Sequence, residues 1–505
     1  MYKLLLIRQY LLKRRLAWIS LFAVALCTAM VLVVISVMGG WLRMFQDLNH
    51  KLVGDIVVSD TSFQGFGHYE EMLQKIRALP EVNGAVPVIQ TYGLLNVDGQ
   101  IPEAVQVIAY GDLQDIDKVN GFHESLYRQY KKPMEHIIAD KSLTNQQRQA
   151  MIDQLDQTPP NFDKPLSPEE YMFAYEEQQN PSATFPLKSV ANWPGMICGV
   201  GTIGITRDAN GNWKRGAYMN QVYQAWATLT LLDMRDSGGM MGMDMTPHPF
   251  WVADDSRTGL FAVDSKTVYV PFDALQEALG MEAQQYTSMS DHKQHTEPAL
   301  ANQIQIGCKP GTNLEALAEK IKANVLPIYL KGEGTVPQHL MVETWDEQQA
   351  PFLEAVENEK VLEIILFGII SVVSIFLIFC IFFMIVAEKT RDIGIIKSIG
   401  ATGSGVAGIF LGYGLTIGIF GGGLGLLFAY LIVHNINGLQ DWVALEFGVR
   451  IWNPQTYVFD TIPNTMDPHD VAVIVGVAIF SALVGALVPA IRAARMHPVE
   501  ALRWE

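Results

Sequence analysis

The sequence predicts a membrane protein: four transmembrane α-helices (1 + 3) with a large α+β extracytoplasmic domain between helices one and two. Three observations carry this prediction: four long apolar segments, a mostly polar block between the first two of them, and an asymmetric placement of Lys and Arg at their ends. With 505 residues, of which 49% are hydrophobic, the chain is long enough for more than one domain.

The four apolar segments are 16–42, 361–387, 403–433 and 471–491. Each reaches the roughly 20 residues that a helix needs to cross a hydrocarbon core of about 30 Å. The first segment is longer than the apolar core of a signal peptide, and Gly39-Gly40-Trp41 is a poor cleavage site, so we expect an uncleaved anchor.

Orientation follows from the positive-inside rule. The tail 1–15, the loop 388–402 and the tail 492–505 carry the flanking Lys and Arg, and four helices place all three pieces on one side. We therefore expect a multi-pass membrane protein with these three pieces in the cytoplasm, and with the domain 43–360 and the loop 434–470 on the opposite side of the membrane. The formal net charge of −16 argues against nucleic acid as a partner.

The sequence pattern of the block 43–360 predicts two structural parts. A strand followed by a helix occurs near each end, at 55–59 with 69–79 and at 303–306 with 313–325. We expect these units to join in a membrane-proximal α+β part formed by about 43–90 and 256–347. Residues of about 91–255 then form a second part. Cys198 and Cys308 lie in this block and either pair or remain two separate thiols.

The charged segment 388–402 lies between the second and third apolar segments and has helix-compatible spacing. It is either an amphipathic connector at the membrane surface or a surface on which a cytoplasmic partner pushes. The candidate residues for contact with that partner are Glu388, Lys389, Arg391, Asp392, Gly394, Lys397, Gly400 and Ala401.

This segment, Val386-Ala387-Glu388-Lys389-x-Arg391-Asp392-Ile393-Gly394, resembles the cytoplasmic loop of the MacB/FtsX/LolC-LolE class of ABC-transporter permeases. The tail from Pro489 to Arg503 is similar to the ending of the same class. The resemblance implies a coupling helix that docks on a cytoplasmic ABC ATPase dimer, which would hold ATP and Mg²⁺, and a second permease subunit, either the same chain or a paralogue. It also implies a location in the inner (cytoplasmic) membrane with the large domain in the periplasm, where the part formed by about 91–255 would bind cargo or a partner. Membrane lipid surrounds such a protein.

Trp193–Gly199 is similar to a stretch of the lipoprotein-releasing LolC and LolE permeases. That likeness implies extraction of lipoproteins from the inner membrane and their transfer to a periplasmic carrier. Two alternatives remain: MacB-like tripartite efflux of drugs, peptides or toxins, and FtsX-like activation of a cell-wall hydrolase.

Glycines recur along the third apolar segment with small-x-x-x-small spacing, which permits close helix contact. They pack either against neighbouring helices of the same chain or at a sliding seam between two permeases. The candidate packing residues are Gly408, Gly412, Gly414, Gly418 and Gly422.

A methionine-rich stretch in the outer block contains Met240, Met241, Met243 and Met245 among glycines. It is a candidate loop for cargo or a partner, because methionine adapts to irregular apolar surfaces. Binding of Cu(I) and a loop without either role are the alternatives.

The sequence carries no motif for catalysis, for a resident metal or for nucleotide binding: G-x-x-x-x-G-K-[ST], G-x-S-x-G and H-E-x-x-H are all absent. We therefore expect a non-catalytic subunit without a cofactor of its own. The energy for transport must come from ATP hydrolysis on another chain.

Overall fold

The computed structural model describes residues 15–61, 65–97, 102–162, 193–207, 213–215, 226–232, 245–287, 294–333, 339–448, 452, 462–497 and 499. The chain divides into two compact units. The first, here called the helical unit, comprises Met1–Phe45, Phe352–Trp452 and Thr461–Glu505. The second, here called the sheet unit, comprises Gln46–Pro351 and Asn453–Asp460.

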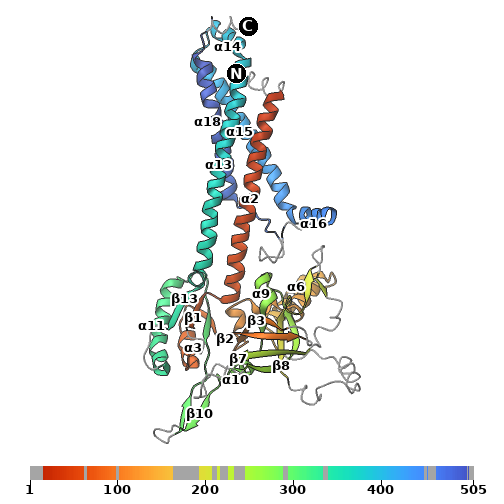
Figure 1. The fold of residues 1–505 in the computed structure, drawn as a ribbon, viewed down its shortest axis with the longest axis vertical. Helices are drawn as coiled ribbons and strands as arrows, with labels where there is room; N and C mark the ends of the chain where they lie inside the picture. The colour runs from red at the N-terminus through yellow and green to blue at the C-terminus, as the bar shows by residue number, and fades with distance from the viewer. Residues whose placement is uncertain are drawn as a thin grey trace. The chain divides into compact units, whose positions relative to one another are not determined.

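The helical unit contains long apolar helices and two shorter ones (Figure 1). They are α2 (Arg15–Val53), α13 (Ala350–Glu388), α14 (Thr390–Ser398), α15 (Gly403–His434), α16 (Ile436–Phe447) and α18 (Pro468–Arg495), of which α2 and α13 continue into the sheet unit. Four stretches among the described residues are long and apolar enough to cross a membrane: Trp18–Val53, Ile365–Glu388, Gly403–His434 and Pro468–Arg495. One lies before the sheet-unit residues and three after them, which confirms the predicted fold class.

The long helices of this unit share a buried apolar core. It contains one residue of α2, two each of α13 and α15, and two alanines of α18: Val24, Ile378, Phe382, Tyr413, Ile417, Ala482 and Ala486. Small residues on α15 and α18 let these two helices approach closely, while bulky side chains of α13 fill the space beside them. Large apolar side chains on the other faces, such as Phe376 and Phe420, are exposed, as expected of surfaces that meet lipid.

The sheet unit is built on a nine-stranded sheet with the order β13-β1-β12-β2-β3-β9-β4-β8-β7. Its strands are β1 (Ile56–Asp60), β2 (Val82–Val97), β3 (Glu103–Tyr110), β4 (Gly195–Gly199), β7 (Trp226–Leu232), β8 (Met245–Ser256), β9 (Thr267–Tyr269), β12 (Gln303–Cys308) and β13 (Leu340–Thr344).

Strand β2 belongs to two parts of this sheet. Its first half pairs with β12, from Val82↔Cys308 to Val88↔Gln303, and its second half pairs on the same edge with β7, from Gly93↔Leu231 to Val97↔Ala227. The additional β2–β7 pairing closes β2, β3, β9, β4, β8 and β7 into a ring of strands. The second half of β2 therefore forms part of a small barrel, and this arrangement leaves no open edge there.

The first half of β2 forms an open layer with β12, β1 and β13. Ile56 of β1 lies opposite Ile306 and Thr344, so the strands predicted near the two ends of the block are neighbours in one sheet. Helices α3 (Tyr69–Arg77) and α11 (Leu314–Glu333) contact each other, and Lys331 of α11 pairs with Glu71 of α3 at 3.1 Å. Residue 90, at which the sequence analysis divides the block, lies inside β2, and β9 joins the barrel.

Shorter elements connect these strands. They are η1 (Ile116–Lys118), α4 (Phe122–Ser125), the π-helix η2 (Tyr127–Lys131), α5 (Lys132–Ala139), α6 (Asn145–Asp156), β5 (Ile205–Arg207), β6 (Trp213–Arg215), α9 (Phe261–Lys266), α10 (Phe272–Ala278), β10 (Gln284–Thr287), β11 (Gln294–Glu297) and α12 (Trp345–Gln348). All four cysteines lie in described residues and are free; Cys198 is buried in the core of the sheet unit.

Candidate functional site

The charged segment between the second and third spans contains the end of α13, the short helix α14 and the residues that lead into α15. Helix α13 ends at Glu388, and α14 occupies Thr390–Ser398, so the helical part is shorter than the predicted segment 388–402. The hydroxyl of Thr390 donates to the carbonyl oxygens of Ala387 at 2.8 Å and Val386 at 3.2 Å. These hydrogen bonds join the first residue of α14, the buried Thr390, to the last turn of α13, and so fix the point at which the chain changes direction.

One face of α14 is packed into the helical unit. Ile393 is buried together with Val386 of α13, Val406 and Phe410 of α15, and two alanines of α18, Ala490 and Ala493. Gly394 is also buried beside this cluster, and Ala401 packs against its edge. Because Ile393 contacts a cluster with members from three other helices, α14 cannot move alone without exposing apolar surface.

Lys397 attaches the end of α14 to the end of α18. Its ammonium group donates to the carbonyl oxygens of Ala494 at 2.7 Å and Met496 at 2.6 Å. The last carbonyls of a helix have no partner within the helix and carry partial negative charge, so a cation is favoured there. Lys397, one of the residues predicted to contact the cytoplasmic partner, thus engages its ammonium group inside the chain.

The other predicted charges differ in exposure. Lys389 pairs with Asp392 one turn away, whereas Arg391 and Glu388 are exposed. Gly400 has a φ of +105°, which only glycine adopts without strain, and it ends the segment before α15. Thr402 then caps α15, because its hydroxyl accepts from the backbone N–H of Gly405 at 3.2 Å.

The exposed side of α14 combines one cation with apolar side chains. Ile395 is 43% exposed and Ile399 is 82% exposed, and Arg391 is exposed on the same short helix. We call these three residues the docking face. Exposed isoleucines on such a segment fit either predicted role, an amphipathic connector at the membrane surface or a surface that a protein partner contacts.

The glycines of α15 contact helices of the same chain. A Cβ atom on Gly414 would lie 2.6 Å from the Cβ of Ala486, and one on Gly418 would lie 3.0 Å from the Cβ of Ala482, both on α18. Gly425, which the candidate set omits, approaches α2, where a Cβ would lie 2.7 Å from the carbonyl oxygen of Ala25.

Of the remaining packing candidates, Gly422 has only an ordinary contact with Val475. Gly408 and Gly412 are partly buried. The close approaches at Gly414 and Gly418 favour packing within the chain over a seam between two permeases.

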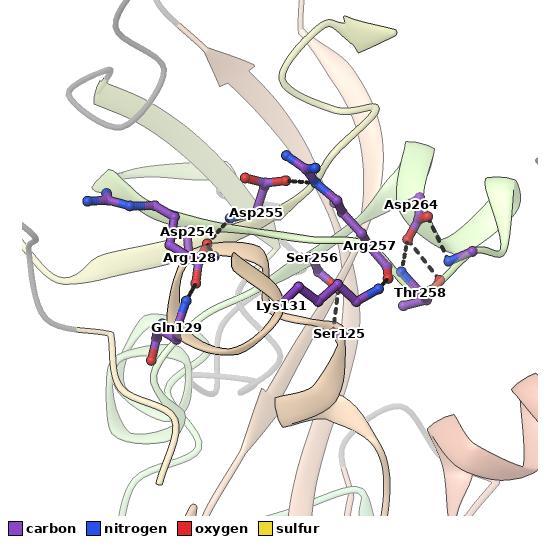
Figure 2. Close-up of polar contacts among 12 residues, drawn as sticks. Ser125, Arg128, Gln129, Lys131, Asp254, Asp255, Ser256, Arg257, Thr258 and Asp264 are labelled. Carbon is purple, nitrogen blue, oxygen red and sulfur yellow. Dashed lines mark hydrogen bonds and ion pairs between the residues drawn. The ribbon is translucent and has the colours of Figure 1, made fainter. Parts of the chain in front are cut away.

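A buried polar network joins β8 to the π-helix η2 in the sheet unit (Figure 2). The carboxylate of Asp254 accepts hydrogen bonds from the backbone N–H groups of Arg128 at 2.9 Å, Gln129 at 3.1 Å and Asp255 at 2.7 Å. Ser256 and Ser125 share a hydrogen bond of 2.8 Å. Burial raises the pKa of Asp254 to about 6, although the three N–H donors oppose this shift.

The same strand end fixes a cation beside an aromatic ring. Arg257 pairs with Asp255, and its guanidinium carbon lies 3.3 Å above the centre of the Tyr127 ring. Lys131 donates to the carbonyl oxygen of Arg257, and burial lowers the pKa of its ammonium group. Asp264 accepts from the backbone and hydroxyl of Thr258, both at 2.8 Å (Figure 2).

Sequence reasoning did not find this network. The available signal is Asp254-Asp255, two adjacent carboxylates at the end of the strand β8. Of the methionine loop, Met240, Met241 and Met243 lie outside the described residues, and Met245 begins β8 with 59% of its surface exposed. No group of three or more metal-ligating side chains occurs among the residues that were described.

Comparison with known proteins identifies the region that contains α14. Residues 364–498 match the family model of the FtsX-like permease C-terminal domain. The chain is 33% identical over 164 residues to the lipoprotein-releasing system transmembrane protein LolC of Neisseria meningitidis serogroup B, a match that covers 32% of this chain and 40% of LolC. It is 25% identical over 166 residues to the lipoprotein-releasing system transmembrane protein LolE of Haemophilus influenzae, and this match covers 33% of the chain and 40% of LolE.

Among solved structures, the periplasmic region of MacB from Actinobacillus actinomycetemcomitans is 9% identical, with a TM-score of 0.28 over 63% of this chain and 98% of that one. The matches to LolC and LolE each span about 40% of the length of these relatives.

Proposed function

We propose that this chain, whose residues 364–498 form an FtsX-like permease C-terminal domain, is the permease subunit of an ABC transporter. The domain contains three of the four candidate spans together with α14. In this proposal the subunit is not itself catalytic. Two copies of a separate ATPase bind ATP and Mg²⁺ on the cytoplasmic side, and a second permease, identical or paralogous, completes the transporter.

The docking face is the observation that carries the proposal. Arg391 and Ile395 are exposed on a short helix and Ile399 directly after it, while the opposite side of this helix is packed through Ile393 and tied through Lys397. A helix held on one side and presented on the other is suited to receive force from a partner. The absence of a nucleotide-binding motif in the sequence supports a partner that supplies the energy.

Helix α13 offers a path for that force. It is continuous over 39 residues, which corresponds to about 58 Å at the usual rise of 1.5 Å per residue. Its apolar span, Ile365–Glu388, needs about 36 Å of this length, so the helix extends by about another 20 Å beyond the hydrocarbon region. We propose that motion at α14 moves α13 and thereby changes the sheet unit, which binds cargo.

A lipoprotein of the inner membrane is the cargo that we propose, to be passed to a periplasmic carrier. This proposal rests on the names of LolC and LolE, to which this chain is similar over about a third of its length. It also agrees with the similarity of Trp193–Gly199 to the corresponding stretch of those permeases.

The coupling is tested on the complex purified from native membranes through a tag on this chain. We expect an ATPase to co-purify with this chain. We also expect that Arg391→Glu and Ile399→Glu each abolish most of the stimulation of ATP hydrolysis by the permease, while expression and membrane insertion stay unchanged. Arg391→Lys and Ile399→Leu are matched controls that keep the charge and the apolar surface, and they should behave like the wild type. Absence of an ATPase, or full stimulation in both Glu variants, would refute the proposed coupling.

The cargo is tested separately. The purified complex is placed in liposomes that contain a labelled lipoprotein, and release to a soluble carrier is followed with ATP and without it. ATP-dependent release supports lipoprotein transport. A coupled ATPase without release would retain the permease function and contradict the proposed cargo.

A further inference from the structure

A short helix at the far end of α15 has two different faces. Helix α16 (Ile436–Phe447) follows the candidate span Gly403–His434 after the single residue Asn435, and Figure 1 shows it turned crosswise to α15. Gly448 ends α16 with a φ of +67°, and its N–H donates to the carbonyl oxygen of Ala444 at 3.1 Å. The helix is therefore a defined element with its own cap.

The polar side of α16 is held by the chain that returns to α18. The side chain of Asn437 makes two hydrogen bonds to the backbone of Ile462, donating at 2.9 Å and accepting at 2.8 Å. One turn on, the buried side chain of Gln440 accepts from the N–H of Trp452 at 3.0 Å. These contacts fix the rotation of the helix about its own axis.

The opposite side of α16 presents large apolar side chains outward. Leu439 is 47% exposed, Trp442 55% and Leu445 67%, and helical spacing places these three away from Asn437 and Gln440. The exposed Glu446 lies between Leu439 and Trp442 on this side, and Phe447, 65% exposed, lies nearer to Gln440. Trp442 and Phe447 also contact each other edge to face, with 6.0 Å between ring centres. Such a set in a helix that is anchored by its polar side is typical of a helix lying in a membrane interface.

The neighbouring surface identifies the occupant. The last turns of α15 expose Leu427, Phe428, Tyr430 and Leu431, all within the candidate span, so the apolar side of α16 continues a surface that meets lipid. Tryptophan and tyrosine are enriched where the hydrocarbon region meets the headgroups. Helix α16 has no Lys or Arg, and its two charges are Asp441 and Glu446.

We infer that α16 is an interfacial helix that inserts Leu439, Trp442 and Leu445 into the lipid leaflet on the side opposite α14, with the carboxylate of Glu446 at the headgroup level. The attachment rests on apolar insertion and not on anionic headgroups, because the helix carries only negative charge. It anchors the end of α15 at the membrane surface. This inference goes beyond the proposed function and is independent of the identity of the cargo.

The test uses the full chain in liposomes of labelled phosphatidylcholine. The photoreactive residue p-benzoylphenylalanine replaces Trp442, Leu445, Ala444 or Phe428, one at a time, and lipid adducts are quantified after illumination. Ala444 lies on the side of the helix opposite Trp442 by helical geometry, and Phe428 is the lipid-facing reference. We expect adducts at positions 442 and 445 comparable with position 428 and several-fold above position 444, unchanged when phosphatidylglycerol is added.

Equal labelling at positions 442 and 444, or adducts to protein alone at 442 and 445 while 428 captures lipid, would overturn the inference. A strict requirement for phosphatidylglycerol would also contradict it, because that result would make the attachment electrostatic. The measurement needs no ATPase, so its outcome is separate from that of the coupling experiment.

Discussion

Replacing Gly414 with alanine tests the packing of α15 against α18. In Gly414→Ala the new Cβ would lie 2.6 Å from the Cβ of Ala486, whereas ordinary contact begins at 3.4 Å. The helices must therefore separate by about 0.8 Å, because neither Cβ atom can rotate away from its backbone. Overpacking of this kind costs about 1–3 kcal/mol. Alanine recovers at most about 1 kcal/mol through its better helix propensity.

We therefore expect a net loss of about 1–2 kcal/mol in the free energy of unfolding. Gly423→Ala is the matched control on the same helix: no atom lies within 4 Å of its added Cβ, so stability should stay the same or rise. The double variant Gly414→Ala/Ala486→Gly restores the space and should be more stable than the sum of the single changes predicts, by at least about 1 kcal/mol.

The assay is reversible unfolding of the detergent-solubilised chain in increasing sodium dodecyl sulfate, followed by circular dichroism. The reasoning is refuted if Gly414→Ala and Gly423→Ala have equal stabilities. It is also refuted if the double variant equals the sum of its single changes, because the contact with Ala486 would then not be the cause.

Two further predictions concern the charged groups. Lys397→Met keeps the apolar stem but leaves the carbonyls of Ala494 and Met496 without their donor, so amide hydrogen exchange in α14 and at the end of α18 should accelerate. Lys389→Met, which removes the partly exposed pair with Asp392, should change this exchange little, and equal effects would contradict the attachment. Because burial raises the pKa of Asp254 to about 6 from 3.8, its folded form holds the proton more tightly than its unfolded form. The free energy of unfolding of the sheet unit should therefore fall by about 2–3 kcal/mol as the pH rises from about 4 to about 6, and urea titrations should show no such fall in Asp254→Asn.

The long spans and the first layer of the sheet unit were predictable because their signals are local. Apolar length alone marks α15, and helical spacing of Met72 and Ile76 marks α3. The pairing of β1 with β12 follows from two similar strand–helix units. By contrast, the closure of the barrel depends on the second half of β2 meeting β7, and nothing in either strand specifies a partner more than a hundred residues away.

At the candidate site, residue types were predictable but their partners were not. The charge of Lys397 is visible in the sequence, yet its engagement depends on where α18 ends, which only the packing of α15 against α18 determines. Helical spacing places Ile395 and Ile399 on one side, where both are exposed, but the buried contact comes from Ile393, and its partners lie on helices distant in the sequence. Asp254 is buried because the N–H groups of the π-helix satisfy its carboxylate, and π-helices have no simple sequence signature.

The attachments of α14 change how the proposed coupling works. If α14 were only the continuation of α13, a push on the docking face would act on that helix alone. Ile393 instead packs in a cluster with Val406 and Ala490, and Lys397 holds the end of α18, so α14 is connected to α15 and α18 as well. A push on Arg391 and Ile399 would then move these helices together, because displacing α14 alone would expose the cluster and break both hydrogen bonds of Lys397. Under the proposed function, therefore, Lys397→Met should weaken the stimulation of the ATPase even though its side chain lies off the docking face. If the coupling depended only on contact between the ATPase and the docking face, this variant would remain fully coupled.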